Sequence, residues 1–285
     1  MGRSRVRRRV IVIALVVGVL AGGAIVVRRL VLNDSTSAVG TSEAVKRFRD
    51  RTDPTTAGNT VATDPGSTVD RAPDTVPVPA ASLPTLGVYR YTTSGSEHID
   101  VLGGTGHTYP AQTTLTVTTD ACGANLRWDL LKERWEDWRL CITAAGVVWQ
   151  AQGGHFYHEF FGHGQMQTLT CDRPALLVPL DRSPRPTLPL ECQLDTEEWQ
   201  PQWTVIGPDT RTVAGVHVPV VHVRMVVDMN RKYYEHTTMD YWLDAHGLPV
   251  HVAGTKTSKS DSGLVGDVIY TETISADLES LEPLR

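Results

Sequence analysis

Three absences limit what the start of this chain can be. Residues 1–29 contain no acidic residue, the first 121 residues contain no cysteine, and Phe48 is the only aromatic residue between Asn33 and Leu83. Without cysteine, the N-terminus lacks the attachment site of a bacterial lipoprotein. Residues 33–84 are rich in Ser, Thr, Asp, Ala and Pro, with no sustained apolar period, so we expect a disordered linker. A short helix at residues 42–51 is the alternative, but ten residues alone are marginally stable in water.

The chain also lacks the motifs of several enzyme classes. There is no Gly-x-Ser-x-Gly elbow, no Walker phosphate loop and no pair of carboxylates in a catalytic setting. The candidate acids Asp240, Asp244 and Glu159 fall in predicted strands or turns, where a solvated position accounts for each of them. We therefore expect no enzyme, no catalytic residue and no cofactor.

A metal site is not expected either. His155, His158 and His163 surround a His-Glu pair, as in some zinc proteases, but a zinc-protease helix places its histidines four residues apart. His158 and His163 are five apart, which puts them on opposite faces of a strand. We interpret them as packing or surface histidines.

What the N-terminus does contain is an apolar run of eighteen residues, Val10–Val27, made only of Val, Ile, Leu, Ala and Gly. As a helix it would rise about 27 Å, close to the ~30 Å thickness of the bilayer hydrocarbon. Five arginines precede it and two follow it, so the positive-inside rule keeps residues 1–9 in the cytoplasm. We predict a single-pass anchor at residues 10–32, with the domain outside the cell membrane. A cleaved signal peptide is the competing interpretation, but the run is too long and no small-x-small cleavage pattern follows it.

The remainder of the chain is acidic. Seven of the 27 basic residues lie in residues 1–29, which leaves 20 basic against 32 acidic residues beyond them. A nucleic acid partner is therefore not expected.

Four cysteines lie in the predicted exterior part, and an even number there indicates two disulfides. None has the short spacing of a zinc site. Of the three possible connectivities, we choose Cys122 with Cys141 and Cys171 with Cys192, because each pair brackets a short segment.

Residues 85–285 are predicted to form one mainly β domain, with α+β as the alternative class. Apolar and polar residues alternate as in half-buried antiparallel strands. The predicted strands are residues 87–93, 113–119, two between 144 and 170, 203–206, 213–227, 233–243, 250–258 and 265–276. Breaks are expected at Asp209, Asn230, 245–247 and 262–263, and five prolines predict an irregular loop between Cys171 and Cys192.

Residues 122–141 allow two interpretations. Trp128, Leu131, Trp135 and Trp138 recur at helical spacing. A disulfide between Cys122 and Cys141, however, requires Cα atoms within ~7 Å of each other. We therefore favour a hairpin, in a register that places Trp128 opposite Trp135 on one face.

Two resemblances add to this interpretation. Residues 212–216, residues 240–250 with their Trp-Leu-Asp and Gly-Leu-Pro, and residues 266–268 resemble the last strands of LolA-like and LppX-like lipoprotein carriers. Residues 122–192, with His-Glu-Phe-Phe-Gly, resemble an actinobacterial cell-envelope family instead. The carrier resemblance implies a curved antiparallel sheet with a cavity for a hydrophobic ligand.

Two functions from different classes follow. The first is an extracytoplasmic domain that binds a lipid or other hydrophobic ligand. The second is a non-enzymatic envelope module that binds a protein or a cell-wall polymer. An apolar cavity of roughly 300 Å³ or more would favour the ligand binder, and a solid core with an exposed aromatic patch would favour the module.

Overall fold

The computed structural model describes residues 36–52, 82–100, 104–160, 162–195, 197–230, 234–261 and 267–285. These residues form one helix and sixteen strands. The elements are α2 Thr41–Thr52, β1 Gly87–Asp100, β2 Thr105–Thr108, β3 Gln112–Asp120, β4 Gly123–Asp129, β5 Arg134–Thr143, β6 Gly146–Phe160, β7 His163–Cys171, β8 Ala175–Pro179, β9 Arg185–Pro189, β10 Cys192–Leu194, β11 Glu197–Trp199, β12 Pro201–Val213, β13 Val216–Asn230, β14 Tyr234–Leu243, β15 Pro249–Asp261 and β16 Asp267–Leu278.

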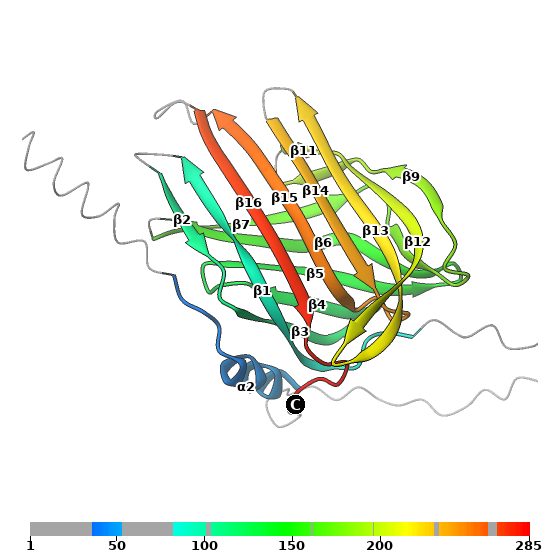
Figure 1. The fold of residues 1–285 in the computed structure, drawn as a ribbon. Helices are drawn as coiled ribbons and strands as arrows, with labels where there is room; N and C mark the ends of the chain where they lie inside the picture. The colour runs from blue at the N-terminus through cyan, green and yellow to red at the C-terminus, as the bar shows by residue number, and fades with distance from the viewer. Residues whose placement is uncertain are drawn as a thin grey trace, which may run out of the picture.

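The strands form a single antiparallel sheet that folds over itself into two layers. Its order is β11-β10-β7-β6-β5-β4-β3-β1-β16-β15-β14-β13-β12-β9, with β2 beside β1 and β8 beside β6. Figure 1 shows the long strands β1 and β16 to β12 crossing in front of β3 to β7. The prediction of a mainly β, antiparallel fold is confirmed.

The alternation of buried and exposed residues along the strands explains why the sheet folds into two layers. In β13, Val223, Met225, Val227 and Met229 are buried, and the residues between them are more exposed. The inner faces of both layers bury their apolar residues against each other, as when Trp149 of β6 meets Trp203 of β12 with ring centroids 5.2 Å apart. The core therefore lies between the two layers.

The segment between the first two cysteines is a hairpin, β4 and β5, as favoured from the disulfide geometry. The predicted register is wrong by one residue, since Trp128 pairs with Glu136 and Trp135 pairs with Asp129. A shift of one residue moves side chains to the other face, so Trp128 is buried in the core and Trp135 lies outside. Leu130, in the turn that fixes this register, is also buried.

Both predicted disulfides are present. Cys122 is bonded to Cys141, with Cα atoms 5.1 Å apart, and Cys171 to Cys192, with Cα atoms 3.9 Å apart. The second bond joins residues that also pair in register between β7 and β10.

Two expected interruptions are instead strands. The segment between Cys171 and Cys192 was predicted to be irregular, but it contains β8 and β9, whose prolines lie at strand ends or on an edge strand, where a missing N–H is tolerated. The break predicted at Asp209 is also wrong. Strand β12 continues through Asp209, and its register shifts between Val205 and Gly207, where Gly207 has a φ of 134°.

Helix α2 confirms the alternative of a short helix at residues 42–51, so a disordered linker is wrong for this part of residues 33–84. Residues 41–52 form a regular helix, and Ala44 and Phe48 on one face are buried with Val39 and Val88. Figure 1 shows α2 beside the lower ends of β1 and β3. Packing on the sheet supplies the stability that an isolated ten-residue helix lacks.

Within the described residues, no helix is long and apolar enough to cross a membrane. The predicted anchor at residues 10–32 lies outside the described residues, as do residues 53–81 of the predicted linker.

Candidate functional site

A hollow between the two layers is the candidate site. Its volume is about 120 Å³, smaller than the roughly 300 Å³ expected of a cavity for a small ligand. Much of its wall is aromatic or sulfur-containing, with side chains from β4, β5 and β6 on one layer and from β12, β13 and β14 on the other. These are Trp128, Trp138, Trp149, Phe156, Trp203, Met225, Met239 and Tyr241. A space of this size and lining suits a narrow apolar group.

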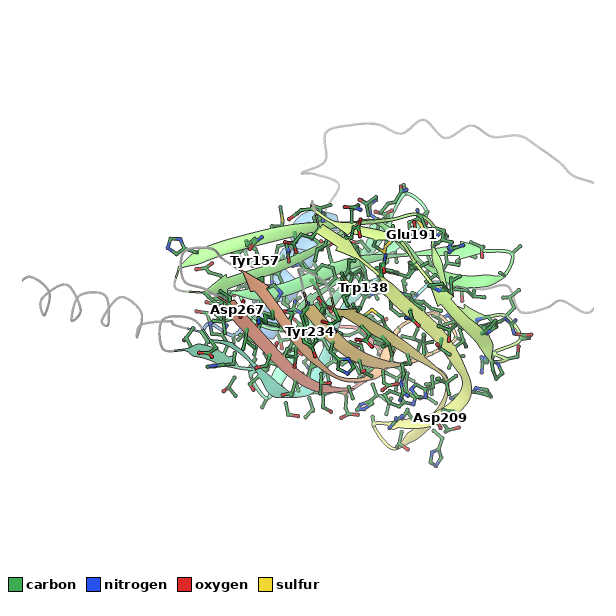
Figure 2. All side chains as sticks on the ribbon, turned by 90° about the horizontal axis from the view of Figure 1, so that it is seen from above. Trp138, Tyr157, Glu191, Asp209, Tyr234 and Asp267 are labelled. Carbon is green, nitrogen blue, oxygen red and sulfur yellow. A yellow bond between two sulfur atoms is a disulfide. The ribbon has the colours of Figure 1, made fainter. Side chains whose placement is uncertain are left out.

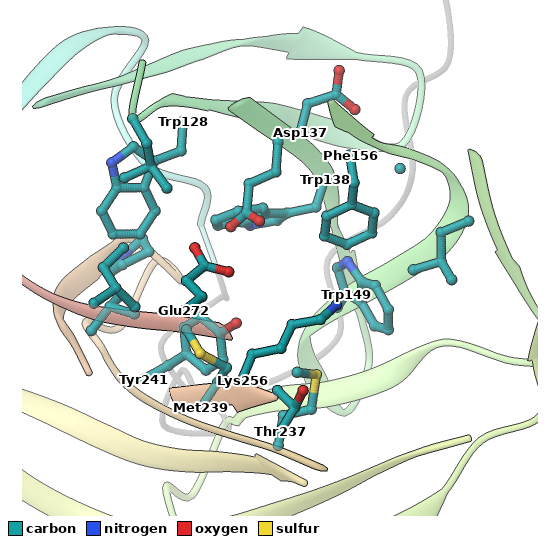
Figure 3. A pocket seen from close by; sticks show the side chains of 18 of the residues that line it. Trp128, Asp137, Trp138, Trp149, Phe156, Thr237, Met239, Tyr241, Lys256 and Glu272 are labelled. Carbon is teal, nitrogen blue, oxygen red and sulfur yellow. The ribbon is translucent and has the colours of Figure 1, made fainter. Parts of the chain in front are cut away.

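Charged side chains also line the hollow. Figure 3 shows Glu272 and Lys256 pointing into the space bounded by Trp138, Trp149 and Tyr241. Arg134, Glu136 and His158 contribute to the same wall. The hollow therefore combines an apolar lining with fixed charges.

Except for Lys256, which pairs with Glu235 at 3.4 Å, these charged groups belong to a buried cluster centred on Glu97 of β1. The Glu97 carboxylate lies 2.7 Å from His107 Nδ1 and 3.3 Å from His158 Nδ1, and it accepts a 2.8 Å hydrogen bond from the Tyr270 hydroxyl. Arg134 Nε is 3.9 Å from the same carboxylate. Glu97 and His107 are fully buried. Such a cluster is stable only when its members satisfy one another.

Glu272 of β16 is the second acid of this cluster. Its carboxylate accepts hydrogen bonds from the hydroxyls of Tyr109, at 2.5 Å, and Tyr270, at 3.0 Å, and Arg134 Nη2 lies at 3.4 Å. Arg134 Nη2 also donates to Glu136 at 3.1 Å. Arg134 therefore lies among three carboxylates contributed by β1, β5 and β16.

The surroundings change the acidity of these groups in different directions. Burial favours the neutral form of Glu97, but hydrogen bonds from His107 and His158 outweigh burial and hold the pKa of Glu97 below its usual value. For Glu136, burial prevails over the Arg134 charge and raises the pKa. Burial, together with the Arg134 charge, lowers the pKa of His158. At neutral pH, Glu97 is therefore ionised beside a neutral His158.

Three buried hydrogen-bond donors of residues that line the hollow have no hydrogen-bond acceptor among the described residues. They are Nε and Nη1 of Arg134 and Nε1 of Trp203. Arg134 Nε lies 3.9 Å from the Glu97 carboxylate, beyond hydrogen-bond distance. A buried donor without a partner costs roughly 1–3 kcal/mol. An acceptor atom brought in by a ligand or by water would remove this cost.

The structure separates the histidines and acids singled out in the sequence. His155 Nδ1 lies 2.9 Å from Asp137, His158 joins the Glu97 cluster, and His163 is exposed at the start of β7. Among the described residues, no group of three or more potential ligands is placed to hold a metal ion.

The three candidate acids have separate local roles. Asp240 pairs with His222 and Arg224 on the outer face of β13 and β14. Asp244 accepts hydrogen bonds from the backbone N–H groups of His246 and Leu248. Glu159 accepts a hydrogen bond from Tyr157. None of the three lines the hollow.

The Glu97 cluster was not predicted from the sequence, although the positions of its acids within alternating strands indicate that they are buried. Glu97 lies an even number of residues from the buried Tyr89, Tyr91 and Thr93, and Glu272 has the same relation to Ile274. A carboxylate on the apolar side of an alternating strand faces the interior. Its partners come from distant strands and leave no local pattern.

A groove of about 300 Å³ lies elsewhere on the molecule, between the start of β13, the turn after β14 and the C-terminal segment. Its acid, Asp244, is engaged with the backbone of its own turn. The groove therefore offers less specific chemistry than the smaller hollow.

No protein family, curated protein or solved structure matches the chain.

Proposed function

We propose that this domain is a binding protein, not an enzyme, and that it holds a lipid or other hydrophobic ligand in the hollow between its layers. We further propose that residues 10–32 anchor it in the cell membrane with the domain outside. The observation that carries the ligand proposal is an aromatic hollow whose lining residues Arg134 and Trp203 hold buried donors without hydrogen-bond acceptors.

The hollow's size and chemistry restrict the ligand. A volume of about 120 Å³ favours one narrow apolar chain over a ligand with several rings. Removing apolar surface from water contributes about 25 cal/mol per Å², and indole and thioether side chains adapt well to such a chain. An acceptor oxygen on the ligand would pair with one of these donors of Arg134 or Trp203.

The alternative, an envelope module that binds a polymer through exposed aromatic residues, receives less support. Trp242 is the candidate on the outer face, but Arg211 lies 3.9 Å from its ring centroid and His222 stacks on it at 4.3 Å. Two groups this close to the same centroid occupy opposite faces of the ring. A sugar ring would therefore have to displace one of them.

The test is lipid analysis of the full chain purified from membranes and exchanged extensively into fresh detergent. Native mass spectrometry and organic extraction should find close to one acyl-containing molecule per chain. In Met239→Trp, a larger side chain fills part of the hollow, and we expect retained lipid to fall several-fold.

His236→Trp is the matched control, because His236 lies on the same strand with its side chain exposed on the outer face. It should retain lipid like the parent chain. Lipid-free parent protein, or equal lipid in all three proteins, would contradict the proposal.

A further inference from the structure

The segment that precedes the sheet is fixed to the domain before helix α2 begins. The backbone N–H of Ser37 donates to a Glu133 carboxylate oxygen at 2.9 Å, and the N–H of Lys132 donates to the Ser37 carbonyl at 2.9 Å. Both partners lie in the turn between β4 and β5. The adjoining helix is held by Arg47, which donates to Asp129 at 2.9 Å. The chain is thus attached to the domain from Ser37 onward.

This attachment limits how far the domain can lie from a membrane. If residues 10–32 form the proposed anchor, only five peptide steps separate Leu32 from Ser37. At ~3.6 Å per step, a fully extended chain spans at most about 18 Å. Residues 53–81 add nothing to this reach, since they connect α2 to β1 and both are parts of the same domain.

The contacts also identify which end of the domain is close to the anchor. The Glu133 carbonyl accepts a 2.8 Å hydrogen bond from the N–H of Glu159, which lies beside the turn between β6 and β7. At that turn, Phe160 packs edge-on against Tyr270 of β16, with centroids 6.3 Å apart. In Figure 2, Tyr157 and Asp267 lie at one end of the molecule and Glu191 lies at the other.

This end carries exposed apolar side chains. Met166 of β7 is 56% exposed, and Ile269, two residues into β16, is 38% exposed. Both flank the end where Phe160 and Tyr270 meet. Large apolar side chains exposed beside a membrane anchor gain free energy by entering the bilayer interface.

We propose that this end of the domain, formed by the β4–β5 turn, the end of β6 and the starts of β7 and β16, lies against the lipid bilayer. The partner is the surface of the membrane that holds the anchor. His158 and Glu272, which line the hollow, then lie nearer the lipid than the β5–β6 turn at the other end of the domain. This inference rests on the proposed anchoring, but not on ligand binding.

The experiment places one fluorescent label on the full chain in phosphatidylcholine vesicles that contain a lipid with a quenching headgroup. Ile269→Cys and Met166→Cys carry the label at the proposed contact. Leu180→Cys is the matched control, because Leu180 is 39% exposed and its N–H bonds Ala145, next to the start of β6. Strand β6, with fifteen residues, separates the two ends by about 45 Å. All four native cysteines are bonded, so the introduced thiol takes the label.

We expect quenching at residues 269 and 166 to be several-fold greater than at residue 180. Equal quenching at the three positions, or greater quenching at residue 180, would overturn the proposed orientation. Flotation of the vesicles separates this failure from failure of the anchoring. A chain that does not float with the vesicles refutes the anchor and this inference together, whereas a floating chain without the difference refutes the orientation alone.

Discussion

At the scale of single residues, the stability of the domain depends strongly on Glu97. This fully buried carboxylate contacts His107, His158 and Tyr270, and lies 3.9 Å from Arg134. Removing one member of a buried charged cluster leaves its partners unpaired in a medium of low polarity, which costs far more than the loss of a surface ion pair.

We predict that Glu97→Gln lowers the free energy of unfolding by about 3–5 kcal/mol at pH 7. Urea denaturation measures this change. Glu197→Gln, at an exposed position in β11, should stay within about 0.5 kcal/mol of the parent chain. If the two substitutions prove similar, the cluster does not stabilise the fold.

The same cluster predicts a pH dependence. The pKa of Glu97 is lowered by folding, so its stabilisation is complete above the unfolded pKa of about 4.3 and is lost as pH falls below that value. The pKa of His158 is also lowered, so stability decreases as pH falls through its unfolded value of about 6.5. Urea titrations between pH 7 and pH 3 should therefore show decreasing stability, and the part of the decrease below about pH 4.3 should be smaller in Glu97→Gln. A stability that rises on acidification would contradict this assignment.

At the scale of elements, α2 is held to the sheet by a small separate cluster, with Phe48 as its largest member. We predict that Phe48→Ala removes hydrogen-exchange protection from residues 41–52 and leaves the thermal transition of the sheet nearly unchanged, because local openings need less free energy than global unfolding. Arg51→Ala, on the exposed face, should leave protection intact. Protection that persists in Phe48→Ala would show that polar contacts hold the helix.

The two disulfides join cysteines that are 19 and 21 positions apart in the sequence. By the chain-entropy relation, each stabilises the fold by about 3 kcal/mol. Replacing Cys171 and Cys192 together by serine should therefore lower the thermal midpoint by several degrees in calorimetry. An unchanged midpoint would mean that pairing of β7 with β10 alone is sufficient.

The strands could be predicted from sequence wherever one face is buried. Residues 233–243 were predicted and β14 is Tyr234–Leu243, and the predicted turn at residues 245–247 contains Gly247 with a φ of 85°. The prediction failed where tertiary contacts decide the outcome. Helix α2 depends on Val88 of β1, and the β4–β5 register depends on burial of Leu130 in the core. Neither contact is visible in the local pattern.

At the scale of the whole molecule, the candidate site could not be predicted, because it exists only after the sheet folds over. Glu97, Arg134 and Glu272 are brought together across as many as 175 residues of sequence. In Figure 1 the sheet passes from one layer to the other between the paired strands β1 and β3. The sequence of no single strand predicts this passage between the layers.

The proposed location makes a separate prediction. In intact cells, a membrane-impermeant maleimide should label Leu180→Cys, whose side chain is exposed on the domain. A cysteine introduced at Ser4, in the predicted cytoplasmic tail, should react only after lysis. The reverse pattern would refute the predicted orientation.

The attachment of α2 also determines whether a proteolytic cut between α2 and β1 would release the domain from the membrane anchor. Helix α2 contacts the sheet through packing and a few polar contacts, and its covalent route to β1 runs through residues 53–81. A single cut in that segment would produce two polypeptides, one with the proposed anchor and α2 and one with the sheet, which remain a complex. Release of the domain from the cell would then follow the dissociation constant of that complex and would depend on dilution as well as on the cut.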